Sequence, residues 1–226
     1  MSTHVKYSVI IAAGGSGSRM GAQIPKQFLL LNDKPIIFHT IQKFVDALPD
    51  IEIIVVLPEY QQKLWHQLVD KHQFNHEVKL AIGGEQRYHS VKAGLALATG
   101  DVIGVHDAVR PLIDKNVIKA VYEQAANTGA AVPVVELTDS IRKITYDESE
   151  AVNRKEYRLV QTPQVFKSNI IKIAYEQKYH PNFTDDATVV EACGHDIVLV
   201  EGNVENIKIT RPVDLVLAAA LLSELS

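Results

Sequence analysis

The chain has 226 residues, of which 46% are hydrophobic and 22% are charged, and its formal net charge at pH 7 is −4. This composition is typical of a globular protein, the length suits a single α/β domain over residues 1–226, and the acidic balance argues against a nucleic-acid partner. No apolar run approaches membrane-spanning length and the first residues lack an apolar signal core, so we expect a cytoplasmic protein without a membrane partner. The one cysteine, Cys193, excludes an internal disulfide framework and is expected to be a small buried residue.

A glycine-rich segment follows the first predicted strand. The apolar run that begins at Val9 predicts a buried strand, which leads into Ala12-Ala13-Gly14-Gly15-Ser16-Gly17. Glycine lets the backbone approach a ligand, and successive N–H groups in such a loop form an anion-binding site. Arg19 and Lys26 add two positive charges close by. Together these features predict a site for a polyphosphate.

Other interpretations of this segment remain open. The glycines could simply form a tight turn between a strand and a helix. The P-loop pattern is absent, because no Gly-Lys-Ser/Thr follows at the required spacing. The dinucleotide pattern begins correctly at Gly15 and Gly17 but has Met20 at its third glycine position, so an NAD-binding oxidoreductase is an alternative function.

Strands and helices alternate after the glycine-rich segment. Asn32-Asp33 and Pro35 predict the start of a helix, whose apolar face includes Ile37, Ile41 and Phe44. The elements expected next are a strand, a helix and a strand, over residues 51–57, 59–72 and 78–82. Buried strands that alternate with amphipathic helices predict a doubly wound, mostly parallel sheet, in which ligands bind beyond the carboxyl ends of the strands.

Unusual polar residues follow two predicted strands, at 78–82 and 102–105. The strand at 78–82 opens into Gly83-Gly84, where an exposed backbone could read the edge of a base, and Ser90 is either a helix N-cap or a base contact. The strand at 102–105 ends in His106-Asp107. A carboxylate at a strand end needs hydrogen bonds, water or a metal, so Asp107 is the candidate Mg²⁺ ligand. Arg110 is expected to bind substrate phosphate or to pair with a carboxylate, and His106 is expected to pack.

The pattern changes after a helix at 114–127 and a strand at 130–135. Residues 137–157 are polar and alternating, which predicts a hairpin arm that leaves the domain. Because an isolated hairpin is barely stable in water, we expect a second copy of the chain to support the arm, and we assign residues 137–160 to dimerisation. A local surface excursion is the alternative.

The last part of the chain returns to the domain. Thr184-Asp185-Asp186 predicts the start of a helix, and residues 197–200 an edge strand. Residues 206–210 are expected to form a strand in which Asn206, Lys208 and Thr210 share one face. A helix over 212–222 is expected to follow.

Several of these motifs together resemble one family. The segments that carry the resemblance are Ala12-Ala13-Gly14-x-x-Gly17-x-Arg19-Met20, Gly83-Gly84-x-x-Arg87-x-x-Ser90-Val91, Asp107-Ala108-Val109-Arg110-Pro111, Thr162-Pro163-Gln164, Thr184-Asp185-Asp186 and Asn206-Ile207-Lys208-Ile209-Thr210-Arg211-Pro212. In their order and completeness they resemble the 2-C-methyl-D-erythritol 4-phosphate cytidylyltransferase family of the non-mevalonate isoprenoid pathway.

The resemblance implies a Rossmann-like nucleotidyltransferase domain with a projecting β-arm, acting as a homodimer with Mg²⁺. It implies a transfer from CTP to methylerythritol phosphate that releases pyrophosphate. The catalytic cations would be Arg19, Lys26 and Lys208. The CTP site would comprise Ala12, Ala13, Gly14, Gly15, Gly17, Gly84, Glu85, Ser90, Asp107 and Ala108, with Asp107 also the metal ligand. The polyol phosphate would meet Arg110, Thr184, Lys208 and Thr210, together with Ser140 and Arg154 of the partner's arm.

Two departures and two alternatives accompany this resemblance. Glu85 stands where family members have an aspartate, and Ser140 where they have a threonine, which keeps the carboxylate and the hydroxyl. Ribitol-5-phosphate cytidylyltransferase resembles the family in fold and in most motifs. A catalytically inactive nucleotide-binding module is the alternative from another class, although the presence of Arg19, Lys26, Asp107 and Lys208 argues against it.

Overall fold

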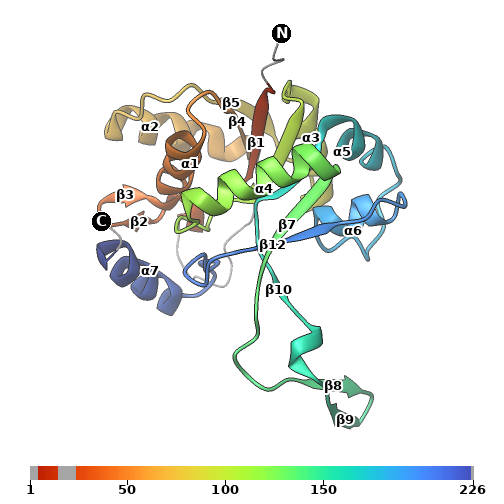
Figure 1. Cartoon of the computed structure of the whole chain (residues 1–226). Coiled ribbons are helices and arrows are strands. Elements are labelled where there is room, and N and C mark those ends of the chain that lie inside the picture. Colours follow the sequence, from red (N-terminus) through yellow and green to blue (C-terminus); the bar gives the residue numbers. More distant parts are fainter. Residues whose placement is uncertain (1–4, 15–23, 225–226) are drawn as a thin grey trace.

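A mostly parallel sheet forms the centre of the computed structural model, which describes residues 5–14 and 24–224 (Figure 1). The strand order is β10-β7-β11-β6-β1-β4-β5, and β12 pairs with β7 at the edge. The strands are β1 (Tyr7–Ala12), β4 (Glu52–Leu57), β5 (Lys79–Ile82), β6 (Val102–Asp107), β7 (Ala130–Val135), β10 (Leu159–Val160), β11 (Gln164–Lys167) and β12 (Val198–Glu201). β11 runs antiparallel to β6 and β7, whereas β6, β1, β4 and β5 are parallel.

Helices cover both faces of this sheet. The helices of the described residues are α1 (Ile36–Ala47), α2 (Gln62–His72), α3 (Arg87–Leu97), α4 (Lys115–Thr128), α5 (Ser168–Ala174), α6 (Asp186–Glu191) and α7 (Pro212–Glu224), of which the first six cover the sheet. α1, α2 and α4 share one buried cluster with alternate residues of β1 such as Val9 and Ile11. α3, α5 and α6 share the other, with Ile10. Successive residues of β1 therefore pack against the helices on opposite faces of the sheet, as expected for a strand buried on two sides.

The sequence-based expectations for most elements are confirmed, and two are wrong. Asn32 and Asp33 do not start a helix. They form the turn of a small hairpin between β2 (Leu30–Leu31) and β3 (Lys34–Pro35), with φ of 46° and 63°, and α1 begins at Ile36. Asn and Asp tolerate this left-handed conformation better than most residues.

Residues 206–210 are also not a strand. Instead of pairing with a strand, their backbone makes separate bonds to the domain, from the Ile209 N–H to the Val109 carbonyl (3.0 Å) and from Arg110 Nη1 to the Asn206 carbonyl (2.7 Å). The isoleucines alternate because Ile207 and Ile209 pack in a third cluster, between α7 and the β2–β3 hairpin. Cys193, expected to be buried, is exposed, because it lies just beyond the short helix α6 and its buried face.

The polar segment after β7 forms the expected hairpin arm. β8 (Arg142–Thr145) pairs with β9 (Glu148–Ala151) in a separate two-stranded sheet, and every residue of both strands is exposed. Figure 1 shows the hairpin projecting well away from the sheet and its helices. Within the described residues no helix is long and apolar enough to span a membrane.

Glu52 joins several segments at the amino ends of the strands, opposite the edge where ligands are expected. Its carboxylate accepts hydrogen bonds from Lys79 Nζ (2.5 Å), Ser8 Oγ (2.5 Å) and the Thr99 N–H (2.8 Å). Burial opposes ionisation, but these donors outweigh it and lower the pKa of Glu52 to about 2.

We expect Glu52→Gln to lower the free energy of unfolding at pH 7 by about 1.5–3 kcal/mol, the range for hydrogen bonds to a charged group. Because folding lowers the pKa of Glu52 from 4.5 to about 2, this stabilisation is complete above pH 4.5 and is lost as the pH falls through 2. Acid unfolding followed by circular dichroism should therefore be flatter over this interval in Glu52→Gln than in the wild type. Glu123→Gln, at an exposed position on α4, is the control. Identical acid unfolding of Glu52→Gln and wild type would contradict this role.

Candidate active site

A cleft of about 410 Å³ lies at the carboxyl ends of β1 and β6, beside the turn before α3. This is the edge of the sheet at which the sequence predicted a ligand. The predicted residues that line the cleft are Ala12, Ala13, Gly14, Lys26, Gly84, Glu85, Ser90, Asp107, Ala108 and Lys208. The lining residues that were not predicted as site residues are Gln27, Gln86, Arg87 and Val109.

The end of β1 is fixed by its neighbours on both sides. Ala12 lies opposite Asp107 of β6 and Val56 of β4. The Ala12 carbonyl accepts the Ala108 N–H (3.2 Å), and the Ala13 N–H donates to the Val56 carbonyl (3.0 Å). These bonds hold this part of the cleft rigid before any ligand arrives.

Another wall of the cleft is the turn that leads into α3. A Cβ atom on Gly84 would lie 2.5 Å from the Cβ of His89, so only glycine fits there. Ser90 is not the N-cap of α3, which is Gln86, but lies in the first turn of the helix. Its Oγ contacts the carbonyl oxygens of Gly84 (3.3 Å) and Gln86 (3.2 Å) and holds this turn against the helix.

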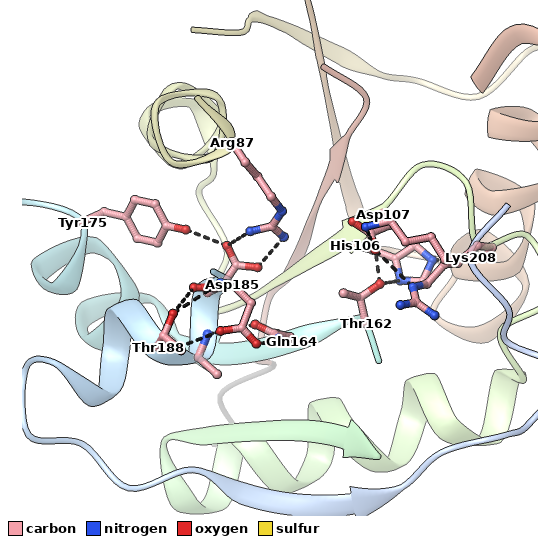
Figure 2. Close-up of polar contacts among 12 residues, drawn as sticks. Arg87, His106, Asp107, Thr162, Gln164, Tyr175, Asp185, Thr188 and Lys208 are labelled. Carbon is pink, nitrogen blue, oxygen red and sulfur yellow. Dashed lines mark hydrogen bonds and ion pairs between the residues drawn. The ribbon is translucent and has the colours of Figure 1, made fainter. Parts of the chain in front are cut away.

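Asp107 is the centre of a charged group in the cleft (Figure 2). Its Oδ2 lies 3.0 Å from Lys208 Nζ and 3.1 Å from Arg110 Nε. Burial raises the pKa of Asp107, but the charges of Lys208, Arg87 and Arg110 outweigh it and hold that pKa well below its usual range. The carboxylate therefore stays ionised at neutral pH and keeps the Lys208 ammonium directed into the cleft.

His106 packs behind this group, as expected. Its Nε2 lies 3.2 Å from the Arg110 carbonyl, which can only accept, so Nε2 carries the proton and Nδ1 accepts from Thr162 Oγ (3.0 Å). Thr162 Oγ in turn accepts the Asp107 N–H (3.1 Å). Burial lowers the pKa of His106 to about 4, against the opposite effect of Asp107. The ring is thus neutral and anchors the Asp107 loop rather than serving as a base.

Two residues that the sequence analysis left without a role shape the cleft wall. Gln27 is buried, and its Nε2 donates to the Ala13 carbonyl (2.7 Å) and to Gln61 Oε1 (2.7 Å). Arg87 forms a two-pronged ion pair with Asp186 of α6. Both partners are distant in the chain, so hydrophobic periodicity carries no signal for either bond. The only signal in the sequence was their position, because Gln27 directly follows Lys26 and Arg87 lies in the segment that begins at Gly83-Gly84.

Comparison with known proteins agrees with this geometry. The family described as 2-C-methyl-D-erythritol 4-phosphate cytidylyltransferase matches residues 7–224. A relative of that name from Bacteroides thetaiotaomicron is 51% identical over 219 residues, which covers 96% of this chain and 100% of the relative. The chain belongs to this family.

Solved structures of cytidylyltransferases have the same fold. The 2-C-methyl-D-erythritol 4-phosphate cytidylyltransferase from Thermus thermophilus is 30% identical, with a TM-score of 0.74 over 96% of this chain and 99% of that one. The 4-diphosphocytidyl-2C-methyl-D-erythritol synthase from Anaerococcus prevotii has a TM-score of 0.82 over 97% of this chain and 99% of that one. At 23% identity the second comparison supports the fold alone.

Some of the residues expected from the cytidylyltransferase resemblance do not line the cleft. Arg110 lies behind Asp107, with Nη1 donating to the Asn206 carbonyl (2.7 Å), so its carboxylate-pairing role is the observed one. Thr210 Oγ donates to Asp214 at the start of α7 (2.9 Å). Thr184 is exposed just before α6.

The remaining expected residues lie on the arm or outside the described part of the chain. Ser140 and Arg154 are exposed on the arm, where Arg154 Nη1 donates to the Thr138 carbonyl. Gly15, Gly17 and Arg19 lie outside the described residues. Within one chain, therefore, the cleft contains the CTP half of the predicted site more completely than the polyol phosphate half.

Proposed function

We propose that this cleft binds CTP and 2-C-methyl-D-erythritol 4-phosphate and joins them to form CDP-methylerythritol, in isoprenoid biosynthesis. Family membership makes the chain a nucleotidyltransferase. The observation that carries the proposal is the position of Lys26 and Lys208 in one cleft with the end of β1, where the glycine-rich segment begins. Two lysines in the cleft at which a glycine-rich segment begins suit a triphosphate.

The reaction requires little covalent work from the protein. A phosphate oxygen of the polyol attacks the α-phosphorus of CTP in line, a new O–P bond forms, and the bond to the β-phosphate oxygen breaks, so that pyrophosphate leaves with the electron pair. The attacking oxygen is already anionic and needs no general base, which agrees with the neutral, buried His106. Catalysis is then positioning plus neutralisation of the spreading negative charge.

We assign the triphosphate to Lys26 and Lys208, with Arg19, and the base to the turn around Gly84 and Ser90. Both lysines and this turn line the cleft. Backbone groups of Ala12 and Ala13 already bond within the protein, so the base contacts we favour there use the second lone pairs of their carbonyl oxygens.

We also propose Mg²⁺ as cofactor, carried in by the triphosphate. Within residues 5–14 and 24–224, no three His, Cys, Asp or Glu side chains gather as a metal site. The cleft does offer the Asp107 carboxylate, and Mg²⁺ on nucleotides normally takes only one or two protein carboxylates beside the phosphate oxygens. The donor set therefore fits a metal held mainly by substrate. Bound there, Mg²⁺ would neutralise phosphate charge.

The hairpin arm is the part that we propose for dimerisation. Ile144, Tyr146, Tyr157 and Leu159 are large side chains that stay exposed along it. Two strands without further cover are barely stable in water, so a second copy of the chain is the natural support. In such a homodimer, residues of one arm could complete the polyol phosphate half of the partner's site. A reducing cytoplasm suits a chain with one cysteine, and we place the enzyme there.

Pyrophosphate release tests the proposed function and its base choice. With Mg²⁺ and methylerythritol phosphate, CTP should give turnover at least about tenfold faster than ATP or GTP. A pocket that is specific for one base must bind it at least about tenfold more tightly than the others. Ribitol 5-phosphate in place of methylerythritol phosphate should support much less turnover, since the curated relatives are named for the latter. Equal turnover with all nucleotides would contradict the base assignment, and faster turnover with ribitol 5-phosphate would favour the alternative enzyme.

A further inference from the structure

One ion pair ties the cleft wall at the start of α3 to helix α6. Arg87 Nη1 lies 2.8 Å from Asp186 Oδ1, and Nη2 lies 2.6 Å from Oδ2. The Asp186 side chain is completely buried, whereas that of Arg87 is 34% exposed and lines the cleft. Parallel bonds of this kind fix orientation as well as distance.

The Asp186 side of the pair is anchored to the sheet. Tyr175 Oη donates to Asp186 Oδ1 (2.6 Å), and Figure 2 shows Tyr175 and Arg87 reaching the same carboxylate from different elements. Asp185, the N-cap of α6, accepts the Thr188 N–H (3.0 Å) and Gln164 Nε2 of β11 (2.7 Å). The first turn of α6 is therefore held firmly beside Thr184.

The Arg87 side of the pair is the turn that we assign to the base of CTP. Arg87 is the first residue of α3, directly after residues 84–86. Its neighbour Tyr88 stacks on Tyr175, with ring centroids 4.7 Å apart, and on Phe183 at 5.8 Å. The start of α3 is thus attached to the segment before α6 by a charged contact at the cleft and an apolar contact behind it.

We propose that Arg87 is a positioning residue, whose ion pair with Asp186 holds the CTP-binding turn in register with the segment around Thr184. This rests on the proposed function, in which Thr184 serves the polyol phosphate. Both terminal nitrogens of Arg87 already bond to a carboxylate, so its charge is largely compensated. In-line transfer needs the two substrates aligned closely, and a displacement of about 1 Å can cost a factor of about a hundred in rate.

The competing role for Arg87 is direct binding of a substrate phosphate, and variants separate the two. If Arg87 positions, Arg87→Lys should be about as impaired as Arg87→Gln, at least about tenfold in kcat/KM, because an ammonium cannot bridge both carboxylate oxygens. Asp186→Asn should be impaired as well, and Arg87→Gln/Asp186→Asn should be no worse than either single variant. If Arg87 instead binds phosphate, Arg87→Lys should keep most activity and Asp186→Asn should keep or gain it.

The measurement is steady-state pyrophosphate release, with kcat and the KM of each substrate determined separately and thermal unfolding recorded alongside. Loss of register should lower kcat and raise the KM of methylerythritol phosphate in variants that remain folded. Lys92→Gln and Glu176→Gln are matched controls, because this exposed pair (3.3 Å) also joins α3 to the end of α5, away from the cleft lining. Their kinetics should equal those of the wild type.

Three results overturn the proposal. These are Arg87→Lys activity close to wild type, Asp186→Asn activity at or above wild type, or wild-type kinetics in every variant with only a lower unfolding temperature. If Asp186→Asn does not fold, the comparison of Arg87→Lys with Arg87→Gln decides alone. Failure of the proposed function is a separate result, since the wild type itself would then release no pyrophosphate from CTP and methylerythritol phosphate.

Discussion

Replacing Lys26 by alanine is expected to lower kcat by about a hundredfold or more, the scale on which one contact to developing transition-state charge contributes. Lys26 begins the short 3₁₀ helix η2 (Lys26–Phe28) and lines the cleft, as Gly14 does. The incoming triphosphate and the polyol phosphate both carry negative charge, and that charge spreads onto the leaving pyrophosphate. A fixed cation at this place stabilises the transition state more than the separated substrates.

The fold of the Lys26→Ala variant should be intact. The neighbouring residues hold η2 in place, because Phe28 is buried in the core and Gln27 bonds to Ala13 and Gln61. Thermal unfolding should therefore change little while kcat falls. Lys26→Arg, which keeps the charge, should retain more activity than Lys26→Ala. Lys115→Ala, on the exposed start of α4, is the control for loss of a lysine elsewhere. Turnover near that of the wild type in a folded Lys26→Ala enzyme would remove Lys26 from the catalytic set.

The half of the site at the strand ends could be predicted because sheet topology alone brings it together. Parallel strands end at one edge, so the residues after β1 and β6 had to meet once the strand pattern was read correctly. Ala12 and Asp107 are indeed direct partners in the register. The turn at Gly84 was placed by the same argument, since β5 also ends at that edge.

The contacts that orient these residues could not be predicted in the same way. Arg87 and Asp186 are 99 residues apart, and Gln27 and Gln61 are 34 apart. Such polar pairs have no periodic pattern, and their partners are set by how the helices pack on the sheet. The error at residues 206–210 has a related cause. Isoleucines alternate in the same way when a segment pairs in a sheet and when it packs between two other elements. The segment around Ile209 does the latter.

The role that we propose for the arm depends on a second chain, so mixing variants can test it. Lys208 lies in the cleft of its own chain, 3.0 Å from Asp107, whereas Arg154 lies on the projecting arm. If Arg154 serves the partner's site, Arg154→Ala and Lys208→Ala homodimers should both be nearly inactive. In a mixed dimer, the Arg154→Ala subunit keeps its own Lys208 and receives an intact Arg154 from its partner, so one of the two sites is complete.

Random 1:1 assembly of these two variants should therefore recover about a quarter of wild-type activity, because about half of the dimers are mixed and each has one complete site. The matched control mixes wild type with the double variant Arg154→Ala/Lys208→Ala. If Arg154 acts across the interface, only wild-type homodimers work in that mixture, and about a quarter of the activity of an all-wild-type sample remains. If Arg154 acts within its own chain, the first mixture stays inactive and the second keeps about half. An activity of about a quarter in both mixtures, with both parent homodimers nearly inactive, is therefore the result expected of an arm that completes the neighbouring site, whereas about half in both mixtures would show that Arg154 is dispensable.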